Sequence, residues 1–325
     1  MKNLAIGIDL GGTNLKGVVL ERDGTRRYLE RIPTEAGKGG TRVMENIVRL
    51  VQMLLEKVGS TDDIVGVGIG TPGFVNDDGL ILGGAENIPG WKGTNMFDPI
   101  REQTGLETAA TNDVTVTALA EARYGVARDV RNMACLALGT GIGGGVIIDG
   151  RVYTGTHGMA GELGHIPVET GGLPCTCGGR GCVEQYASAT GIVKNALIMC
   201  LKVPVHSRTA FVDEALAAPN AVTSKMVYDY VAKGDPVAIE VHEFVCDKLA
   251  CASGAILNAF APDMLVLGGG VMMAGRIIVD TVVKYLPRYC WQQIFERCRV
   301  VSAELGQDAG VLGAAALAFD RLGGE

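Results

Sequence analysis

One pattern of residues occurs twice in this chain of 325 residues and constrains the fold more than any other feature. Each copy consists of an apolar run, a turn of Gly and Thr, a second apolar run, an Asp-Gly pair and a short third run. The first copy occupies residues 4–32 and the second begins at residue 133. Such runs and turns predict β-hairpins. Because the turns fall at matching positions along the unit, we predict a duplication with two related domains facing each other across a cleft.

The rest of the chain alternates between helical and strand patterns. Helical patterns cover residues 41–58, 113–124 and 236–260. Buried-strand patterns cover residues 64–69, 264–267 and 300–303. Asp308 is expected to cap a final apolar helix. This alternation predicts an α/β fold whose sheets are covered by helices.

Composition narrows the class of protein. Of the 325 residues 47 are Gly, about twice the average usage, without the Gly-X-Y period of collagen. We therefore expect backbone groups to take part in the chemistry. The chain is 47% apolar and 20% charged with a net charge of −7, which excludes a disordered chain and disfavours nucleic acid as a partner. Without a signal-peptide pattern or a run of ~18 apolar residues, we expect a cytoplasmic protein that binds a small molecule and no membrane.

The glycine turns at residues 11–13 and 139–141 are candidate phosphate sites. Such a turn leaves backbone N–H groups unpaired and lets an anion approach without a Cβ in its way. Asp9 precedes the first turn, within reach of a phosphate-bound Mg²⁺ through water. Taken singly, each turn is equally well explained as an ordinary hairpin. Together with the glycine run 268–270, the two turns predict a nucleotide site.

Two other nucleotide-binding motifs are not supported. Residues 139–144 match G-x-G-x-x-G, but a strand pattern follows, whereas a dinucleotide-binding fold requires a helix there. The chain has no G-x-x-x-x-G-K-[ST] motif, since Lys38 is followed by Gly39. The sequence therefore supports neither a Rossmann dehydrogenase nor a P-loop NTPase.

A compact group of metal-ligating residues lies in the second half of the chain. Cys175, Cys177 and Cys182 are close together and interleaved with glycines, and His165 precedes them. Three thiolates and one imidazole suit tetrahedral Zn²⁺, and four protein ligands close its coordination sphere. We therefore predict a structural zinc ion. The other cysteines are expected to be reduced, buried side chains.

Polar residues near these motifs are candidates for substrate chemistry. Glu162 and Glu184 flank the metal ligands and could accept hydrogen bonds from a polyol, although single glutamates are usually solvated surface residues. Asn112 and Asp113 stand at a predicted helix start, where both are good capping residues. Asp113 could also accept the proton of a hydroxyl that attacks a γ-phosphate.

These segments together resemble the ROK family of sugar kinases and repressors. The likeness extends from residue 4 to the final helix. It rests on Asp9-x-Gly11-Gly12-Thr13, Asn112-Asp113, Gly139-Thr140-Gly141-Ile142-Gly143-Gly144-Gly145, Glu162-x-Gly164-His165 and Cys175-x-Cys177-Gly178-x-x-Gly181-Cys182-x-Glu184. The resemblance implies duplicated actin-like ATPase (ribonuclease H-like) domains, with two mixed sheets flanked by helices around a central cleft. It places a small domain at residues 1–111, joined by the C-terminal helix at about 306–325, and a large domain at 112–305.

The resemblance also implies a role for each matching residue. Asp113 would be the catalytic base. Sugar hydroxyls would be bound by Asn87, Asn112, Asp113, Glu162, His165 and Glu184. MgATP would be bound by Asp9, Gly11, Gly12, Thr13, Asn14, Thr140, Gly141, Gly268, Gly269 and Gly270. Zinc would be bound by His165, Cys175, Cys177 and Cys182, with the second ring nitrogen of His165 presented to the sugar.

The implied activity is ATP-dependent phosphorylation of glucose to glucose 6-phosphate by a homodimer or homotetramer. In the family a Lys often follows Gly-Gly-Thr, but Asn14 stands here and Lys16 lies two residues on, so no lysine is assigned to phosphate. The first alternative is a kinase for mannose, allose, fructose, N-acetylmannosamine or N-acetylglucosamine. The second is a sugar-sensing regulator without catalysis. The presence of Asp113 argues against a regulator, as does the expectation that no DNA-binding module precedes residue 4.

Overall fold

The computed structural model of the chain describes residues 2–324 and divides into two compact units. Of the described residues, unit 1 comprises 2–132, 145–161 and 304–324, and unit 2 comprises 133–144 and 162–303. Residues 112–132 are thus grouped with unit 1. The domain ranges that we expect from the sequence, 1–111 and 112–305, stay a prediction.

Unit 1 is built on a five-stranded mixed sheet with the order β3-β2-β1-β4-β7. Its strands are β1 (Leu4–Leu10), β2 (Asn14–Glu21), β3 (Arg26–Pro33), β4 (Ile64–Thr71) and β7 (Thr108–Asn112). β1, β2 and β3 form an antiparallel meander, whereas β4 runs parallel to β1 and to β7. A separate pair of short strands, β5 (Phe74–Val75) and β6 (Ile81–Gly83), follows β4.

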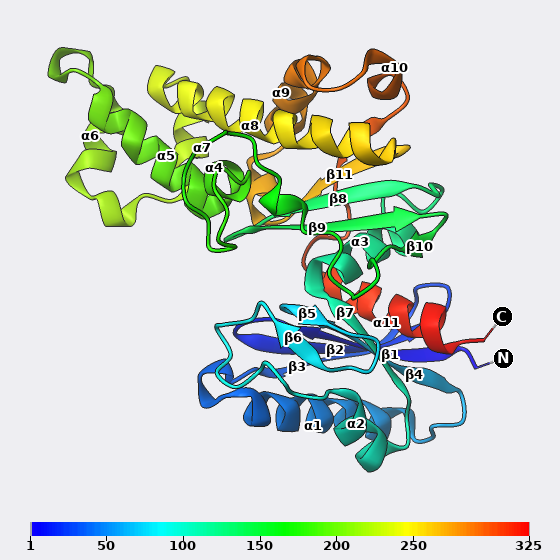
Figure 1. The fold of residues 1–325 in the computed structure, drawn as a ribbon. Helices are drawn as coiled ribbons and strands as arrows, with labels where there is room; N and C mark the ends of the chain where they lie inside the picture. Colours follow the sequence, from blue (N-terminus) through cyan, green and yellow to red (C-terminus); the bar gives the residue numbers. More distant parts are fainter. Residues whose placement is uncertain (1, 325) are drawn as a thin grey trace. The chain divides into compact units, whose positions relative to one another are not determined.

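Helices cover both faces of this sheet (Figure 1). Helix α1 (Gly40–Val58) packs on one face through an apolar cluster that includes Ile6 and Ile8 of β1, and α2 (Phe97–Thr104) packs beside it. Helix α11 (Ala309–Leu322) packs on the other face, and α3 (Asp113–Tyr124) packs against α11. Alternate residues of β1 therefore enter two different cores, as the two-residue period of a strand requires.

Helix α11 contacts the backbone of the sheet directly. A Cβ atom added to Gly7 would lie 2.3 Å from the carbonyl oxygen of Val311, and one added to Gly68 would lie 1.7 Å from that of Ala314. Both distances are far below any van der Waals contact. The two strands that α11 crosses, β1 and β4, therefore require glycine at these positions.

A buried carboxylate fixes the segment that leads into α11. Glu121 of α3 is fully buried, and it accepts hydrogen bonds from the backbone N–H groups of Val126 (3.1 Å), Glu304 (3.0 Å) and Leu305 (2.9 Å). Three such bonds compensate the loss of hydration of the anion. Glu121 thus holds together the end of α3 and the approach to α11.

A second five-stranded sheet has the order β10-β9-β8-β11-β12, and its strands lie in unit 2 except for β10 and the end of β9, which lie in unit 1. The strands are β8 (Met133–Leu138), β9 (Ile142–Ile148), β10 (Arg151–Val152), β11 (Met264–Gly268) and β12 (Arg299–Ser302), and the chain passes from unit 2 into unit 1 within β9. β11 runs parallel to both β8 and β12. The strand order is the same as in the first sheet. In both sheets the three strands of the repeated unit lie in reverse chain order, and two strands from later in the chain follow them. The predicted duplication is therefore confirmed.

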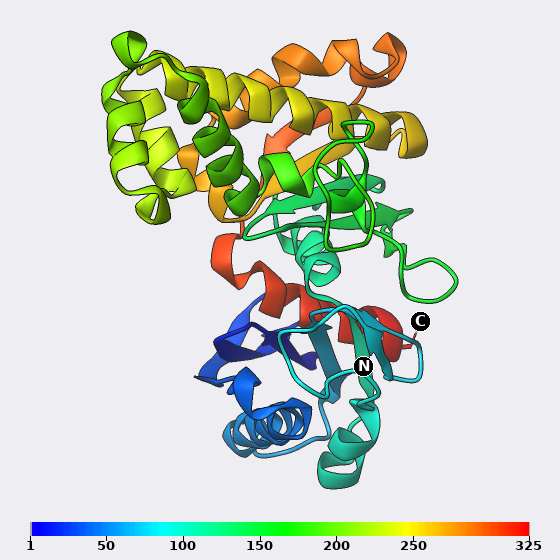
Figure 2. The ribbon, with the colours of Figure 1, turned by 60° about the vertical axis from the view of Figure 1, so that its left-hand side comes forward.

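Unit 2 also contains most of the helices. Its long helix α8 (Pro236–Phe260) packs against α4, α5, α7 and α9 (Figure 2). The others are α4 (Glu184–Ala187), α5 (Ala189–Lys202), α6 (Ala210–Ala217), α7 (Ser224–Ala232), α9 (Ile277–Tyr285) and α10 (Gln292–Phe295). No helix in residues 2–324 combines the length and apolar character needed to cross a membrane.

For the elements that the sequence predicted, most boundaries agree within two residues. β2 and β9 begin at Asn14 and Ile142, directly after the two glycine turns, because pairing with neighbouring strands extends each strand up to its turn. The expected capping by Asp308 is wrong. Asp308 precedes α11, but its carboxylate makes no cap hydrogen bond and instead accepts one from Arg26.

A buried hydroxyl in unit 1 gives a test of this packing. The Thr108 side chain in β7 is buried, and its oxygen has no hydrogen-bond partner among the described residues. We expect Thr108→Val to raise the free energy of unfolding by about 1 kcal/mol, because an unsatisfied polar group is replaced by a methyl group of similar size. The measurement is the midpoint of denaturant-induced unfolding.

Thr71→Val in the neighbouring strand is the matched control. The Thr71 hydroxyl accepts a hydrogen bond from the Trp91 indole (3.3 Å) and donates one to the Pro72 carbonyl (3.1 Å). This substitution should lower the free energy of unfolding by about 1–2 kcal/mol. Equal destabilisation by both substitutions would contradict the assignment.

Candidate functional site

The residues expected to carry function fall into two groups, one in each unit. Unit 1 holds Asp9, Gly11, Gly12, Thr13, Asn14, Asn87, Asn112 and Asp113. Unit 2 holds Thr140, Gly141, Glu162, His165, Cys175, Cys177, Cys182, Glu184, Gly268, Gly269 and Gly270. In unit 2 the structure brings together residues that are far apart in the sequence.

The first glycine turn joins β1 to β2 and is open to a ligand. The Gly11 N–H donates to the Asn14 carbonyl at 3.2 Å and closes the turn. Gly12 and Thr13 are exposed, and a Cβ added to Gly12 would meet no atom within 4 Å. A phosphate could therefore approach the backbone of this turn closely.

Asp9 lies on β1 just before the turn, beside Lys16 and helix α11. It pairs in register with Lys16, and a Cβ added to Gly310 would lie 2.8 Å from the Asp9 carboxylate. Burial raises the pKa of Asp9, and the charge of Lys16 opposes this rise. Lys16 itself donates from Nζ to the carbonyl of Gln307 at 2.6 Å. The Asp9 oxygens are of the kind that Mg²⁺ prefers, so this carboxylate fits a place beside a hydrated ion.

Asn112 and Asp113 stand at the start of α3, as the sequence predicted. The Asn112 side-chain oxygen caps the helix by accepting from the N–H groups of Val114 (2.9 Å) and Thr115 (3.4 Å). Asp113 is the first helical residue, and one of its oxygens accepts from the Val114 N–H at 2.9 Å. Both residues are only partly buried, so their side chains remain within reach of a ligand.

Asn87 lies on an exposed segment that is fixed by its neighbours. Asn87 is exposed, whereas Ile88 and Trp91 are buried in the apolar core of unit 1. The carbonyl of Pro89 accepts a hydrogen bond from the Gly40 N–H at the start of α1, at 2.8 Å. The segment therefore presents Asn87 to solvent from a rigid base.

In unit 2 the predicted polyol-binding residues lie together. His165 Nε2 is 3.7 Å from a Glu162 carboxylate oxygen. Burial raises the pKa of Glu162, the nearby His165 lowers it, and the charge of Glu184 raises it further. Glu184 also accepts a hydrogen bond from the Ile142 N–H at 3.0 Å, which ties it to the residue after the second glycine turn. Two carboxylates and one imidazole thus form one polar cluster.

The four predicted metal ligands also converge. The ligand atoms of His165, Cys175, Cys177 and Cys182 all lie within 4.8 Å of one another. His165 Nδ1 is 3.5 Å from the Cys175 sulfur, and the sulfurs of Cys177 and Cys182 are 3.6 Å apart. A tetrahedral ion with Zn–S bonds of about 2.3 Å and a Zn–N bond of about 2.0 Å requires S–S and S–N separations of about 3.8 and 3.5 Å. The residues fit zinc, and His165 uses its two nitrogens on opposite sides, one toward the thiols and one toward Glu162.

The backbone around these thiols is adapted to the cluster. The Gly179 N–H donates to the Cys177 sulfur at 3.4 Å, as amides do to metal-bound thiolates. Gly181 has a φ of 76°, and a Cβ there would lie 1.9 Å from the Glu169 carbonyl, so only glycine fits. Gln185, which no sequence motif indicated, donates from its side chain to the Cys175 sulfur at 3.6 Å. Its position directly after Glu184 was the only signal for it.

The second glycine turn and the glycine run after β11 complete the unit 2 group. The Gly139 N–H donates to the Gly141 carbonyl at 2.9 Å, and Thr140 is exposed at the tip of the turn. Gly269 has a φ of 89°, and a Cβ there would lie 2.4 Å from the Leu138 carbonyl of the neighbouring strand. The run 268–270 therefore packs against the end of β8, just before the turn.

Comparison with known sequences gives a uniform result. A family model described as the ROK family matches residues 5–321. The chain is 34% identical to a glucokinase from Halalkalibacterium halodurans, over 95% of this chain and 92% of that protein. It is 32% identical to a glucokinase from Thermotoga maritima, over 98% of both chains. An N-acetyl-D-glucosamine kinase from Haemophilus influenzae is 31% identical over 96% of this chain and 98% of its own length.

Solved structures agree with the sequence relatives. A ROK hexokinase from Thermus thermophilus superposes with a TM-score of 0.83 at 30% identity, covering 98% of this chain and 99% of that one. A ROK family glucokinase from Streptomyces griseus, solved in complex with glucose and AMPPNP, gives a TM-score of 0.77 at 29% identity, with 98% and 99% of the two chains covered. With the duplicated mixed sheets, these matches confirm the actin-like ATPase fold. The family match over nearly the whole length establishes that this chain belongs to the ROK family.

Proposed function

We infer that this chain is an ATP-dependent sugar kinase, and we propose that glucose is its preferred sugar and glucose 6-phosphate its product. The observation that carries the proposal is the cluster of Glu162, His165 and Glu184 attached to the cysteine set. Two carboxylate acceptors and the remaining N–H of a metal-bound imidazole form a rigid group that suits the adjacent hydroxyls of a hexose. The glucokinases among the relatives support glucose over other hexoses.

Asp113 is assigned as the catalytic base. It stands at the N-terminus of α3, where the helix dipole favours an ionised carboxylate. The carboxylate accepts the proton of the sugar 6-hydroxyl while that oxygen attacks the γ-phosphorus and the bond to ADP breaks. Because phosphoryl transfer passes through a loose transition state, the proton moves late and a carboxylate of ordinary basicity suffices.

The remaining site residues are assigned to binding. Glu162, His165 and Glu184 accept or share hydrogen bonds with sugar hydroxyls, and Asn87 and Asn112 provide further amide contacts. The turns at Gly11–Asn14 and Thr140–Gly141 and the run 268–270 bind the nucleotide through backbone groups. Asp9 would hold Mg²⁺ through water, and the ion would neutralise charge on the phosphates.

Zinc is proposed as a structural ion held by His165, Cys175, Cys177 and Cys182. Its four protein ligands leave no open position, so it takes no part in phosphoryl transfer. His165 belongs to the ligand set and Glu184 lies beside Cys175, so the ion would fix these two sugar-binding side chains. Cytoplasmic location and assembly as a homodimer or homotetramer belong to the same proposal.

One alternative substrate class has support of its own. The N-acetyl-D-glucosamine kinase among the relatives is nearly as similar to this chain as the glucokinases are. The polar cluster offers carboxylate acceptors and one imidazole N–H to hydroxyl groups and does not by itself select among hexoses. An N-acetylhexosamine is therefore the second candidate for the acceptor.

A test of the base is the substitution of Asp113. Asp113→Ala and Asp113→Asn should lower kcat by about 10²–10⁴-fold, because no other assigned group can accept the hydroxyl proton. The dissociation constant for glucose should change little. A coupled ADP-release assay and calorimetric titration with glucose measure the two quantities.

Asp98→Ala is the matched control for this test. Asp98 lies in the first turn of α2, is half-exposed and pairs with Arg101. Its removal should leave turnover unchanged. Near-normal turnover in either Asp113 variant would refute the assigned mechanism.

A second test concerns the metal. The wild-type protein should contain about one zinc per chain, and Cys177→Ser should release it, lower the melting temperature and raise KM for glucose. Elemental analysis of the purified protein gives the metal content. Cys251→Ser, outside the ligand set, should retain zinc. Absence of zinc from wild-type protein purified without chelators would overturn the assignment.

The third test is a panel of sugars with ATP. Glucose should give the highest kcat/KM among glucose, mannose, allose, fructose, N-acetylglucosamine and N-acetylmannosamine. A higher value for an N-acetylhexosamine would transfer the proposal to the second candidate. Turnover of none of these sugars, by protein that binds glucose, would favour a non-catalytic sugar sensor.

A further inference from the structure

A single residue, Thr34, donates two hydrogen bonds to the backbone of the first glycine turn. The Thr34 hydroxyl donates to the Gly11 carbonyl at 2.6 Å, and the Thr34 backbone N–H donates to the Thr13 carbonyl at 2.9 Å. Thr34 directly follows β3 and is fully buried. Two carbonyls of one short turn are thus occupied by the same threonine.

The second glycine turn is held in the same way by residues from a different element. The Thr190 hydroxyl donates to the Thr140 carbonyl at 2.8 Å, and the Ala189 backbone N–H donates to the Gly139 carbonyl at 2.8 Å. Both donors belong to the first turn of α5. One threonine hydroxyl and one backbone N–H again occupy two carbonyls of the turn.

These contacts determine where the amides of the turns point. In a planar trans peptide the C=O of one residue and the N–H of the next point in opposite directions. Fixing the Gly11 and Thr13 carbonyls therefore directs the N–H groups of Gly12 and Asn14 away from Thr34. The same argument directs the N–H groups of Thr140 and Gly141 away from α5. All four residues are among those proposed to bind the nucleotide.

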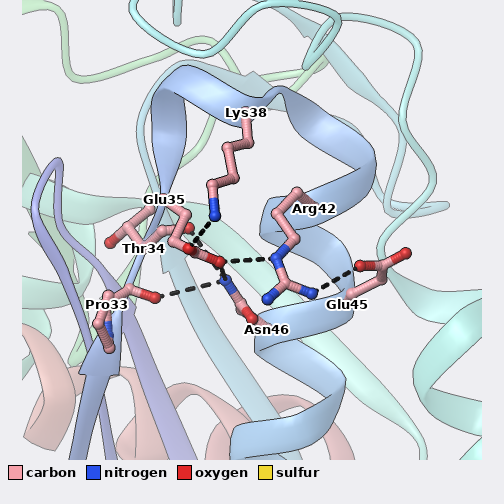
Figure 3. Close-up of polar contacts among 7 residues, drawn as sticks. All are labelled: Pro33, Thr34, Glu35, Lys38, Arg42, Glu45 and Asn46. Atoms are coloured by element: carbon pink, nitrogen blue, oxygen red, sulfur yellow. Dashed lines mark hydrogen bonds and ion pairs between the residues drawn. The ribbon is translucent and has the colours of Figure 1, made fainter.

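A charged network fixes Thr34 in turn (Figure 3). Lys38, Arg42 and Asn46 all donate to the carboxylate of Glu35, and Asn46 also donates to the carbonyls of Pro33 (3.4 Å) and Thr34 (3.3 Å). The hydrogen bonds from Lys38, Arg42 and Asn46, named in decreasing order of their effect, lower the pKa of Glu35 to about 2. Glu35 has a φ of 56°, a left-handed conformation that a non-glycine residue adopts only when its surroundings enforce it.

Thr190 has a support of its own. The Ser188 side chain caps α5 by accepting from the Gly191 N–H at 3.0 Å, and its hydroxyl lies 3.1 Å from that of Thr190. The Ser188 hydroxyl also donates to the Glu184 carbonyl at 2.6 Å. Thr190 therefore lies beside a serine that caps α5 and bonds to the backbone of a proposed sugar-binding residue.

We propose that Thr34 and Thr190 are positioning residues for the nucleotide phosphates, each orienting the amides of one glycine turn without touching the ligand. The proposal rests on the proposed function, because it takes the two turns as the phosphate-binding backbone. A merely structural role would lower stability and affect both substrates. A positioning role weakens nucleotide binding selectively and is restored by any residue that keeps the hydroxyl.

Calorimetric titration of the full chain with Mg-AMPPNP and with glucose tests the proposal. The variants are Thr34→Val, Thr190→Val, the double variant, Thr34→Ser and Thr190→Ser. Thr108→Val is the matched control, because it removes a buried threonine hydroxyl that has no hydrogen-bond partner among the described residues. Melting temperatures establish that each variant is folded. If a Val variant is unfolded, the Kd of the matching Ser variant provides the test at that position.

Each Val substitution should raise the Kd for Mg-AMPPNP about fivefold, as the loss of one hydrogen bond implies, and the double variant about 25-fold. The Kd for glucose should stay within about twofold, and the Ser and Thr108→Val proteins should bind both ligands like wild type. Folded Val variants with wild-type affinity for Mg-AMPPNP would overturn the proposal. It would also be overturned if the affinity for glucose fell by the same factor, or if the Ser variants lost as much affinity for Mg-AMPPNP as the Val variants.

The outcome for the proposed function is read separately. A wild-type chain that binds Mg-AMPPNP but phosphorylates no hexose refutes the kinase reaction, while the Kd values of the variants still decide the roles of Thr34 and Thr190. A wild-type chain that turns over glucose while the folded Val variants bind nucleotide normally refutes only the positioning roles. A wild-type chain that binds no nucleotide overturns both.

Discussion

Close contact between helix α11 and the strands beneath it is the constraint on which the unit 1 site depends. The helix lies so near the sheet that β1 and β4 need glycine where it crosses them. Its own Gly310 lies against the Asp9 carboxylate, and a Cβ on Gly313 would lie 1.7 Å from the Val116 carbonyl of α3. A larger residue at any of these positions would move α11 outward and open the space beside Asp9. The surroundings of this carboxylate are therefore set by backbone packing.

The same observation changes the meaning of the glycine excess. The composition suggested that backbone groups take part in chemistry, and the open turns fit that expectation. Other glycines serve packing alone: a Cβ on Gly164 would lie 1.8 Å from the Ile142 carbonyl, and one on Gly254 would lie 2.5 Å from the Tyr289 side chain. Composition counts both kinds together. Only the structure separates glycines that face a ligand from glycines that admit a neighbouring element.

Local signals made much of the fold and the metal set predictable from sequence. Asn112 and Pro236 mark helix starts by their own preferences, and the cysteines from Cys175 to Cys182 are close enough in sequence to converge. Long-range contacts were beyond such reasoning. Asp308 has the side chain of a cap, but Arg26 binds its carboxylate, and nothing in the sequence connects Glu184 with the Ile142 amide. These pairings are decided by tertiary packing.

The two glycine turns show how a structural repeat can include hydrogen bonds whose donors are not part of any sequence repeat. Donors to the first turn come from the residue after β3, and donors to the second come from the start of α5. No common motif includes Thr34 and Thr190, because they follow their turns at different distances and on different elements. The common feature is the pair of occupied carbonyls on each turn. A requirement placed on backbone geometry can be met by any element that supplies an N–H and a hydroxyl, so the repeat persists in the hydrogen bonds after it has disappeared from the sequence.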